Sequence, residues 1–232
     1  MYSLVIPAHN EAKNLPKLVG KSHSALKKTR QVFEIIIVND NSTDNSYGVL
    51  KMLQKKFKEL RIVNRASNPG VGYAIRQGIS SAKGSIIITM DGDLSHDPYE
   101  MPKLLAQLKN YDMVCGSRYT KGGKANMASS RKLVSVLFNI VFRTLIGIKV
   151  RDFTSGYRAY NADILKKISL KSRKFGIFIE IPLKAYLAGF RLAEVPITYH
   201  KREHGKSNLN FFKKGPEYLK VALEAIWIKI WK

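Results

Sequence analysis

The run Ser85-Ile86-Ile87-Ile88-Thr89-Met90-Asp91-Gly92-Asp93 decides the fold class of this chain. Its first part is mostly apolar and β-branched, and turn-forming residues follow it, a pattern typical of a buried strand. Asp91 and Asp93 would then leave the strand at its carboxyl end, where open α/β sheets bind ligands. Two carboxylates flanking a glycine offer hard oxygen ligands to a divalent cation, which usually takes its remaining ligands from water and substrate phosphates. The alternative for an isolated Asp-Gly-Asp is an ordinary turn.

Strand and helix signals alternate on both sides of this run. The expected strands cover 4–6, 34–38, 61–64, 86–90 and 113–115, and the expected helices cover 14–28, 43–58, 71–82 and 98–109. Such alternation predicts an α/β fold with a mostly parallel central sheet and helices on both faces. Asp97 is interpreted as the cap of the fourth helix and not as a third metal carboxylate. Pro98 suits its first position, and Glu100 its third, as in a capping box.

The pattern changes after Ser117. A glycine- and lysine-rich loop, an apolar helix, a Thr-Ser-Gly turn, two further helices and a strand are expected at 120–125, 130–147, 154–156, 162–168, 178–188 and 192–198. We predict one domain over residues 1–208. Residues 209–232 are predicted to form an amphipathic C-terminal helix, whose tryptophans and lysines fit a membrane interface. The alternative is a terminal helix packed on the core of the domain itself.

Charge is the unusual feature of the composition. The 232 residues include 40 Lys and Arg against 17 Asp and Glu, a formal net charge of +23. This excess should attract nucleic acid, an anionic membrane or anionic small substrates, although a plain lysine-rich surface would give the same count. The single cysteine, Cys115, excludes an internal disulfide and favours a reducing compartment. The five histidines show no zinc-ligand spacing with it.

Neither the amino terminus nor the longest apolar stretch is typical of a secretory or membrane-spanning segment. The amino terminus, Met1 to Pro7, lacks the basic region and long apolar core of a signal peptide and is interpreted as a first strand. The longest apolar stretch, 133–148, contains Asn139 and Arg143, so it is too short and too polar to span a bilayer comfortably.

Polar segments follow three other predicted strands. They are 7–11 (Pro-Ala-His-Asn-Glu), 39–44 (Asn-Asp-Asn-Ser-Thr-Asp) and 68–72 (Asn-Pro-Gly-Val-Gly). With the two aspartates they would line one rim of the sheet, giving acceptors for a nucleoside beside a metal for its phosphates. The glycine loop is not a dinucleotide fingerprint, because Ile75 stands where a third glycine is expected. The sequence therefore predicts a nucleoside-diphosphate site and not a dehydrogenase.

Eight motifs in order resemble those of family 2 glycosyltransferases of GT-A (Rossmann-like) fold. The resemblance runs from Leu4 to about Asn210 and is strongest to the polyprenyl-phosphate sugar synthases, typified by dolichol-phosphate mannose synthase. The motifs are Pro7-Ala8-His9-Asn10-Glu11, Asn39-Asp40 with Ser42-Thr43-Asp44, Asp91-Gly92-Asp93-Leu94-Ser95-His96, Gly116-Ser117-Arg118-Tyr119, Arg131 to Ser135, Asp152-Phe153-Thr154-Ser155-Gly156-Tyr157-Arg158, Val195-Pro196-Ile197 and Arg202 to Ser207.

The resemblance implies a role for particular side chains. The metal ligands are Asp91 and Asp93, which hold Mg or Mn, and the remaining roles fall on two sets. The nucleotide-binding set is Pro7, Ala8, His9, Glu11, Val38, Asp40, Asp91 and Gly92. The catalytic and phosphate-binding set is Asp93, Arg118, Arg131, Ser135 and Arg202. Guanidinium groups match phosphate oxygens and stay charged, which agrees with the second set independently.

Three positions depart from the family pattern. Asn39 replaces the first aspartate of the usual Asp-Asp pair, and Ser95 stands where several relatives have a glutamine near the metal. The usual Ser-Lys near the end is Ser207-Asn208, with a lysine displaced to Lys206. A direct third protein ligand to the metal is therefore not expected.

The resemblance implies inverting transfer of a hexose, mannose favoured, from a nucleotide sugar, GDP-mannose favoured, to a polyprenyl (dolichyl) phosphate at the cytoplasmic membrane face. The alternatives are glucose from UDP-glucose, an undecaprenyl acceptor, a family 2 enzyme acting on a sugar hydroxyl, and a basic nucleic-acid-binding protein. The last lacks any recognisable nucleic-acid-binding motif, so no nucleic acid is expected as a partner. The expected partners are the two substrates and an anionic membrane surface, and the resemblance allows a separate membrane-anchoring subunit.

Overall fold

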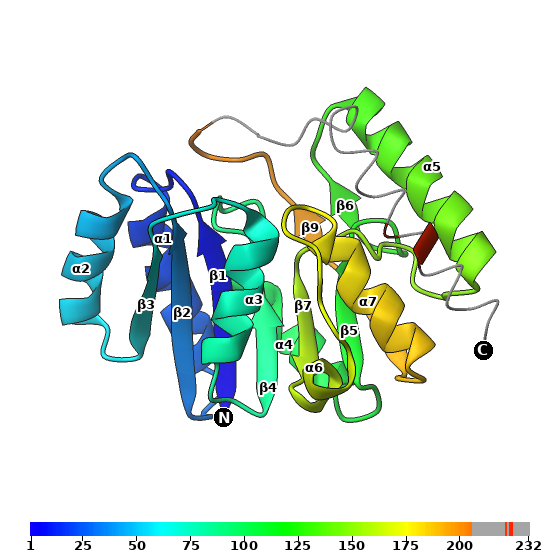
Figure 1. The fold of residues 1–232 in the computed structure, drawn as a ribbon, viewed down its shortest axis with the longest axis horizontal. Coiled ribbons are helices and arrows are strands. Elements are labelled where there is room, and N and C mark those ends of the chain that lie inside the picture. The colour runs from blue at the N-terminus through cyan, green and yellow to red at the C-terminus, as the bar shows by residue number, and fades with distance from the viewer. Residues whose placement is uncertain (206–220, 222, 225–232) are drawn as a thin grey trace.

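The computed structural model describes residues 1–205, 221, 223 and 224. Seven strands within this part form one sheet in the order β3-β2-β1-β4-β7-β5-β8 (Figure 1). They are β1 Tyr2–Ala8, β2 Phe33–Asp40, β3 Leu60–Arg65, β4 Ile86–Thr89, β5 Met113–Ser117, β7 Arg158–Asn161 and β8 Leu192–Pro196. All neighbouring pairs except those of β7 are parallel. The predicted mostly parallel sheet is confirmed.

Helices cover both faces of this sheet, as expected. They are α1 Leu15–Lys27, α2 Ser46–Lys56, α3 Val71–Ser81, α4 Met101–Gln107, α5 Ser129–Ile146, α6 Asp163–Lys167 and α7 Ile177–Leu187. In Figure 1, α3 and α7 lie in front of the sheet and α1 and α4 lie behind it, while α5 lies at the periphery. Each helix predicted within residues 1–205 is present, with ends that differ by a few residues.

Strand periodicity divides the core between the two faces. Leu4 and Ile6 of β1 pack with the residues of α1 and α4, whereas Val5 between them packs with those of α3 and α7. Because both faces are covered, the central strands are continuous apolar runs and not alternating ones. Gly78 brings α3 close to β1, since a Cβ there would lie 2.3 Å from Val5 Cγ1.

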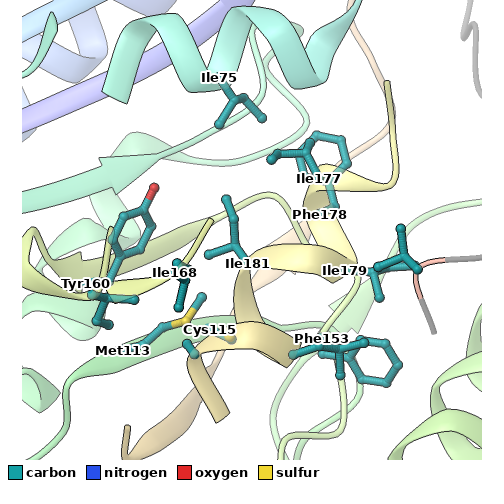
Figure 2. Close-up of a cluster of buried hydrophobic side chains, with 14 of the residues drawn as sticks. Ile75, Met113, Cys115, Phe153, Tyr160, Ile168, Ile177, Phe178, Ile179 and Ile181 are labelled. Atoms are coloured by element: carbon teal, nitrogen blue, oxygen red, sulfur yellow. The ribbon is translucent and has the colours of Figure 1, made fainter. Parts of the chain in front are cut away.

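Cys115 belongs to the cluster on the α3 and α7 side. Figure 2 shows its sulfur among side chains such as Met113 and Ile181, and no part of Cys115 reaches solvent. Burial raises the pKa of the thiol to about 11. The thiol is therefore protonated at neutral pH.

Strand β7 was not predicted from the sequence. It runs antiparallel between β4 and β5, and it begins at Arg158, whose guanidinium is buried and donates to the carbonyls of Phe153 and Phe178. A charged residue at the start of a four-residue strand hides the strand pattern. The predicted strand 192–198 is in turn divided into β8 and the short β9, Thr198–Tyr199, which pairs with β6, Lys124–Ala125, inside the predicted loop.

The segment after the acidic pair is a short 3-10 helix, Pro98–Glu100, which leads into α4. Asp97 caps it, because its Oδ1 accepts a hydrogen bond from the Tyr99 amide at 3.2 Å. The capping-box role of Glu100 is wrong. Its carboxylate instead accepts from the Thr198 amide, at 3.1 and 3.3 Å, and so ties this helix to β9.

The predicted amphipathic C-terminal helix, 209–232, lies almost wholly outside the described residues. Of its positions, Val221 is buried in the cluster on the α3 and α7 side, and the Glu224 carboxylate lies 3.8 Å from the Lys184 ammonium. The interfacial helix therefore stays a prediction. None of the helices in the described part of the chain is long and apolar enough to cross a membrane.

Candidate active site

A cleft of about 370 Å³ opens where β1, β2, β4 and β5 end. All but one of the predicted site residues line it: Pro7, Ala8, His9, Glu11, Asp40, Asp91, Gly92, Asp93, Arg118, Arg131, Ser135 and Arg202. The exception is Val38, which is fully buried and packs in the core with Val5 and Ile36. Strands β1, β2 and β4 are parallel, and β5 runs in the same direction because β7 is antiparallel to both β4 and β5, so the four carboxyl ends share one edge of the sheet.

Asp93 is held in a fixed orientation by the turn that follows it. Its Oδ1 accepts hydrogen bonds from the amide and the hydroxyl of Ser95, at 3.0 and 2.5 Å. Gly92 is required before it, because a Cβ at that position would lie 2.7 Å from the Pro7 carbonyl oxygen. Ser95 stands where several relatives have a glutamine near the metal. In this chain its amide and hydroxyl orient Asp93.

Arg202 joins two acidic groups across the cleft. Its Nη2 lies 2.8 Å from Asp93 Oδ2, and its Nη1 lies 3.4 Å from Glu11 Oε1. Burial raises the pKa of Glu11 to about 7, although the Asn14 amide and Arg202 oppose this rise. The acidic groups from β1 and β4 therefore already hold one cation in this arrangement.

Asp91 carries a perturbed carboxyl group beside a neutral histidine. Burial, followed by the negative charge of Asp93, raises the pKa of Asp91 to about 7. Burial also lowers the pKa of His96 to about 4, so the imidazole is uncharged at neutral pH. Its Nδ1 accepts the Asp91 amide at 3.5 Å and lies 3.7 Å from Asp91 Oδ2. His96 therefore supplies no positive charge to offset the two aspartates.

These pKa values predict an unusual effect of Asp91→Asn. The folded pKa of about 7 exceeds the unfolded value near ~3.9, so ionised Asp91 destabilises the metal-free fold increasingly as the pH rises between these values. In EDTA at pH 8, Asp91→Asn should raise the melting temperature by about 2–4 °C, the shift that about 1 kcal/mol produces in a domain of this size. The gain should shrink at pH 5. Thermal denaturation at both pH values measures it, with exposed Asp163→Asn as the control that shows no such gain. A melting temperature of Asp91→Asn below that of the wild type at pH 8 would contradict the raised pKa of Asp91.

The side of the cleft for which nucleoside binding was predicted is built from residues at the ends of β1 and β2. His9 Nδ1 lies 2.7 Å from the Asp40 carbonyl oxygen. The Asp40 carboxylate accepts from Arg65 Nε at 2.8 Å and from the Gly70 amide at 2.7 Å, so it fixes the start of α3. Asn39 replaces the first aspartate of the family's usual Asp-Asp pair. Its side-chain amide donates to Asn64 Oδ1 at 2.6 Å, and it does not line the cleft.

Arg118 is oriented by a buried carboxylate that sequence reasoning did not single out. Asp152 is fully buried and accepts from Arg118 Nε and Nη2 at 2.7 and 2.8 Å, and also from the Arg118 amide at 2.9 Å. The guanidinium further stacks over Tyr119 and Tyr199, with its central carbon 5.0 and 5.5 Å from the ring centroids. The Arg118 guanidinium holds the pKa of Asp152 below its usual range. With Nε and Nη2 turned to Asp152, the guanidinium is held in a fixed orientation at the cleft.

Arg131 and Ser135 come from the first two turns of α5. Ser135 is 2% exposed, and its hydroxyl interacts with the Tyr119 hydroxyl. The two α5 side chains and Arg118 line the same cleft.

Several residues that line the cleft or support its walls were missed as site residues. Asp152 and His96 lie inside motifs that the sequence displays, but only burial shows that one orients an arginine and the other is neutral. Phe175 and Phe178 form an apolar wall that no motif indicated. Alternation of polar and apolar residues does not signal such a wall, because it comes from the loop before α7 and from its first turn.

The acidic pair fits a divalent cation. The mutual repulsion that raises the pKa of Asp91 would be relieved by a metal between Asp91 and Asp93, and Arg202 already brings positive charge to the second of them. Within the described part of the chain, no cluster of three or more His, Cys, Asp or Glu side chains forms a closed metal site. Mg²⁺ typically binds through one or two carboxylates and completes its shell with water and substrate phosphates, which this donor set allows.

The sheet order and this cleft define a doubly wound α/β protein whose cleft combines an acidic pair with a cluster of arginines. Solved structures share the fold. One is glucosyl-3-phosphoglycerate synthase from Mycobacterium tuberculosis in complex with Mn²⁺, UDP and glucosyl-3-phosphoglycerate, with a TM-score of 0.73 and 18% identity over 97% of this chain and 80% of that one. The same protein with Mg²⁺ and UDP matches with a TM-score of 0.70 and 19% identity, over 97% of this chain and 79% of that one. The GT-A fold is thereby confirmed.

Sequence comparisons show the family to which this α/β protein belongs. The family model for glycosyl transferase family 2 matches residues 3–169. The undecaprenyl-phosphate mannosyltransferase of Micrococcus luteus is 31% identical over 89% of this chain and 86% of its own length. The polyprenol monophosphomannose synthase of Mycolicibacterium smegmatis is 34% identical over 89% and 80%. The dolichol-phosphate mannosyltransferase of Pyrococcus furiosus is 34% identical over 89% of this chain, which spans 58% of that relative. The chain belongs to glycosyl transferase family 2 and is a glycosyltransferase.

Proposed function

We propose that this protein transfers mannose from GDP-mannose to a polyprenyl phosphate, of which dolichyl phosphate is one, with inversion at the anomeric carbon. The observation that carries the proposal is a single cleft that combines the Asp91 and Asp93 pair with Arg118, Arg131 and Arg202. Such a site suits two phosphate-bearing substrates at once. The names of the three relatives support mannose as the sugar and a lipid phosphate as the acceptor.

Binding would use the two sides of the cleft differently. The side built from His9 and the Asp40 carbonyl would receive the nucleoside, and Asp91 and Asp93 would hold Mg²⁺ or Mn²⁺ on the diphosphate. When bound, the metal supplies positive charge that offsets the diphosphate. Arg118, fixed by Asp152, and Arg131 would orient the acceptor phosphate, and the Ser135 hydroxyl would donate to it.

The acceptor needs little activation. A phosphate monoester has its second pKa near ~6 and is largely dianionic at neutral pH. One of its oxygens forms a bond to the anomeric carbon while the bond from that carbon to the diphosphate oxygen breaks, and the electron pair leaves with GDP. Arg202 would meet the departing charge, and its contact with Asp93 supports this role. No proton has to be removed from the acceptor.

A second candidate function is transfer to a sugar hydroxyl. That reaction needs a general base with a pKa near the working pH. Glu11 and Asp91, each with a pKa of about 7, have suitable values, and both line the cleft. Glu11 is bound by Asn14 and Arg202, which ties it to a structural role. The lipid-phosphate acceptor is therefore the better-supported candidate.

The donor preference is tested by a direct comparison. Purified protein with Mn²⁺ and polyprenyl phosphate should use GDP-mannose with a kcat/KM at least about tenfold above that for UDP-glucose, because discrimination of about 1.4 kcal/mol corresponds to one missing contact of the base. Radiolabelled sugar extracted into the lipid phase is the measurement, and EDTA should remove the signal. A preference for UDP-glucose would overturn the mannose assignment and leave lipid-phosphate transfer standing.

We also propose peripheral attachment at the cytoplasmic face of an anionic membrane, with a separate anchoring subunit as a further candidate partner. The formal charge of +23 supports attraction to anionic headgroups, and the single buried Cys115 is in keeping with a reducing compartment. Nucleic acid is not expected as a partner. A melting-temperature shift with GDP and Mn²⁺ that exceeds the shift with an oligonucleotide would support this view, and the reverse order would contradict it.

A further inference from the structure

The glycines at the start of α3 make room for another part of the chain. A Cβ at Gly70 would lie 2.5 Å from the Arg173 carbonyl oxygen, and a Cβ at Gly72 would lie 2.5 Å from the Ser172 carbonyl oxygen. Side chains do not approach backbone oxygens so closely, so only glycine lets the segment 171–175 lie against the first turn of α3. The glycine motif that is no dinucleotide fingerprint therefore serves the close approach of two backbone segments.

A buried carboxylate holds the same segment in place. Glu180 of α7 is 1% exposed, and its carboxylate accepts hydrogen bonds from the amides of Lys171 and Ser172 at 2.7 and 2.8 Å. The Lys184 ammonium also donates to it, at 2.6 Å. Burial opposes the ionisation of Glu180, but these donors keep its pKa below the ordinary value, so the charge is retained. The segment 171–175 is thus fastened to α7 while it lies against α3.

The segment brings two side chains to the wall of the cleft. Lys174 and Phe175 line the cleft together with Gly70 and Val71 of the α3 start. The Gly70 amide donates to the Asp40 carboxylate at 2.7 Å. Gly70 is therefore held by Asp40 through its amide and by the segment through its lack of a side chain. The segment and Asp40 meet at this one residue, on the side of the cleft for which nucleoside binding is predicted.

We propose that Glu180 is a positioning residue for donor binding, because the segment that it fixes is one wall of the nucleotide site. This inference rests on the proposed function. The ammonium of Lys174 and the ring of Phe175 suit the phosphates and the base of a nucleotide. Glu180 does not itself line the cleft, so it acts on the nucleotide only through the segment 171–175.

Calorimetric titration of the full chain with GDP in the presence of Mn²⁺ tests this role. Glu180→Gln keeps the shape of the side chain, but its new amide nitrogen would face a backbone N–H of the segment, so the Kd for GDP should rise at least about tenfold. The matched control is Glu34→Gln. Glu34 is 3% exposed and accepts from the Ser3 hydroxyl and the Lys83 amide, but it lies at the amino end of β2, away from the cleft. This control should lower the melting temperature and leave the Kd at the wild-type value.

Transfer kinetics separate positioning from general damage. In Glu180→Gln the KM for GDP-mannose should rise about tenfold, while kcat at saturating donor stays within about twofold of the wild-type value. A merely structural role would lower the amount of folded protein, and with it the apparent kcat, without a change in KM. That second pattern would overturn the proposal.

A second variant displaces the segment without touching Glu180, and it decides the question if Glu180→Gln does not fold. Gly72→Ala puts a Cβ within 2.5 to 2.7 Å of three backbone atoms of the segment, so the segment has to move and the Kd for GDP should again rise about tenfold. Its control is Gly20→Ala in α1, where a Cβ meets nothing within 4 Å. The control should bind GDP like the wild type and melt at the same or a slightly higher temperature.

The outcomes distinguish this inference from the proposed function. An unchanged Kd in both Glu180→Gln and Gly72→Ala, with a wild type that binds GDP, would overturn the positioning role and leave the proposed function standing. An equal rise of the Kd in Glu34→Gln would assign the effect to general destabilisation and overturn it as well. A wild type that binds neither GDP nor UDP with Mn²⁺ would overturn the proposed function and this inference with it.

Discussion

Asp93→Asn is expected to lower the transfer rate by at least about 100-fold while the melting temperature stays within a few degrees of the wild-type value. Asparagine has nearly the same shape, and its Oδ1 can still accept the two hydrogen bonds from Ser95. What disappears is the negative charge that meets Arg202 at 2.8 Å and would hold the metal. Activity should therefore fall because of lost charge and not because of lost structure.

The matched control for this substitution lies four residues further along the chain. Asp97→Asn removes a carboxylate from the same turn region but outside the cleft, where it caps the short helix through the Tyr99 amide. Asparagine is an equally good cap, so activity should remain at the wild-type level. Rates at saturating Mn²⁺ and melting curves of both variants are the measurements. A folded Asp93→Asn protein with full activity would remove the metal assignment.

Much of the fold could be predicted because its signals are local. The buried strand at 86–90 and the aspartates after it fix where the ligand edge lies, and the alternation of strands and helices fixes the parallel sheet. Strand β7 could not be predicted in the same way. Its buried Arg158 is satisfied by the carbonyls of Phe153 and Phe178, and the Phe178 carbonyl lies twenty residues away, so no local pattern reveals the strand.

In the candidate site, too, local motifs could be recognised from the sequence, whereas long-range contacts could not. Every side chain that the sequence motifs indicated lines the cleft, except Val38. That residue lies in β2 and packs in the core. The motifs did not reveal how these groups hold each other. The bond between Asp152 and Arg118 joins residues 34 positions apart, and the contact of Arg202 with Asp93 joins residues 109 positions apart. Long-range pairs of this kind follow from the folded geometry alone.

A phosphate on the acceptor is expected to have an equally large effect. Arg118, Arg131 and Arg202 supply positive charge at the cleft, and a lipid phosphate brings the negative charge that they orient. A polyprenol lacks that charge and would also need a base to remove its proton. Arg202→Ala should accordingly lower the transfer rate more than the stability, because its side chain is 27% exposed and its removal opens no core cavity. A loss of folding that matches the loss of activity would contradict this role.

The most direct measurement compares two acceptors of equal chain length, polyprenyl phosphate and the free polyprenol, with purified protein, GDP-mannose and Mn²⁺. The account predicts mannosyl transfer to the phosphate at a rate at least about 100-fold above that to the alcohol, since the alcohol forfeits both the arginine contacts and the preformed nucleophile. Comparable transfer to the two acceptors would contradict it, and would favour a hydroxyl acceptor with Glu11 or Asp91 as the base.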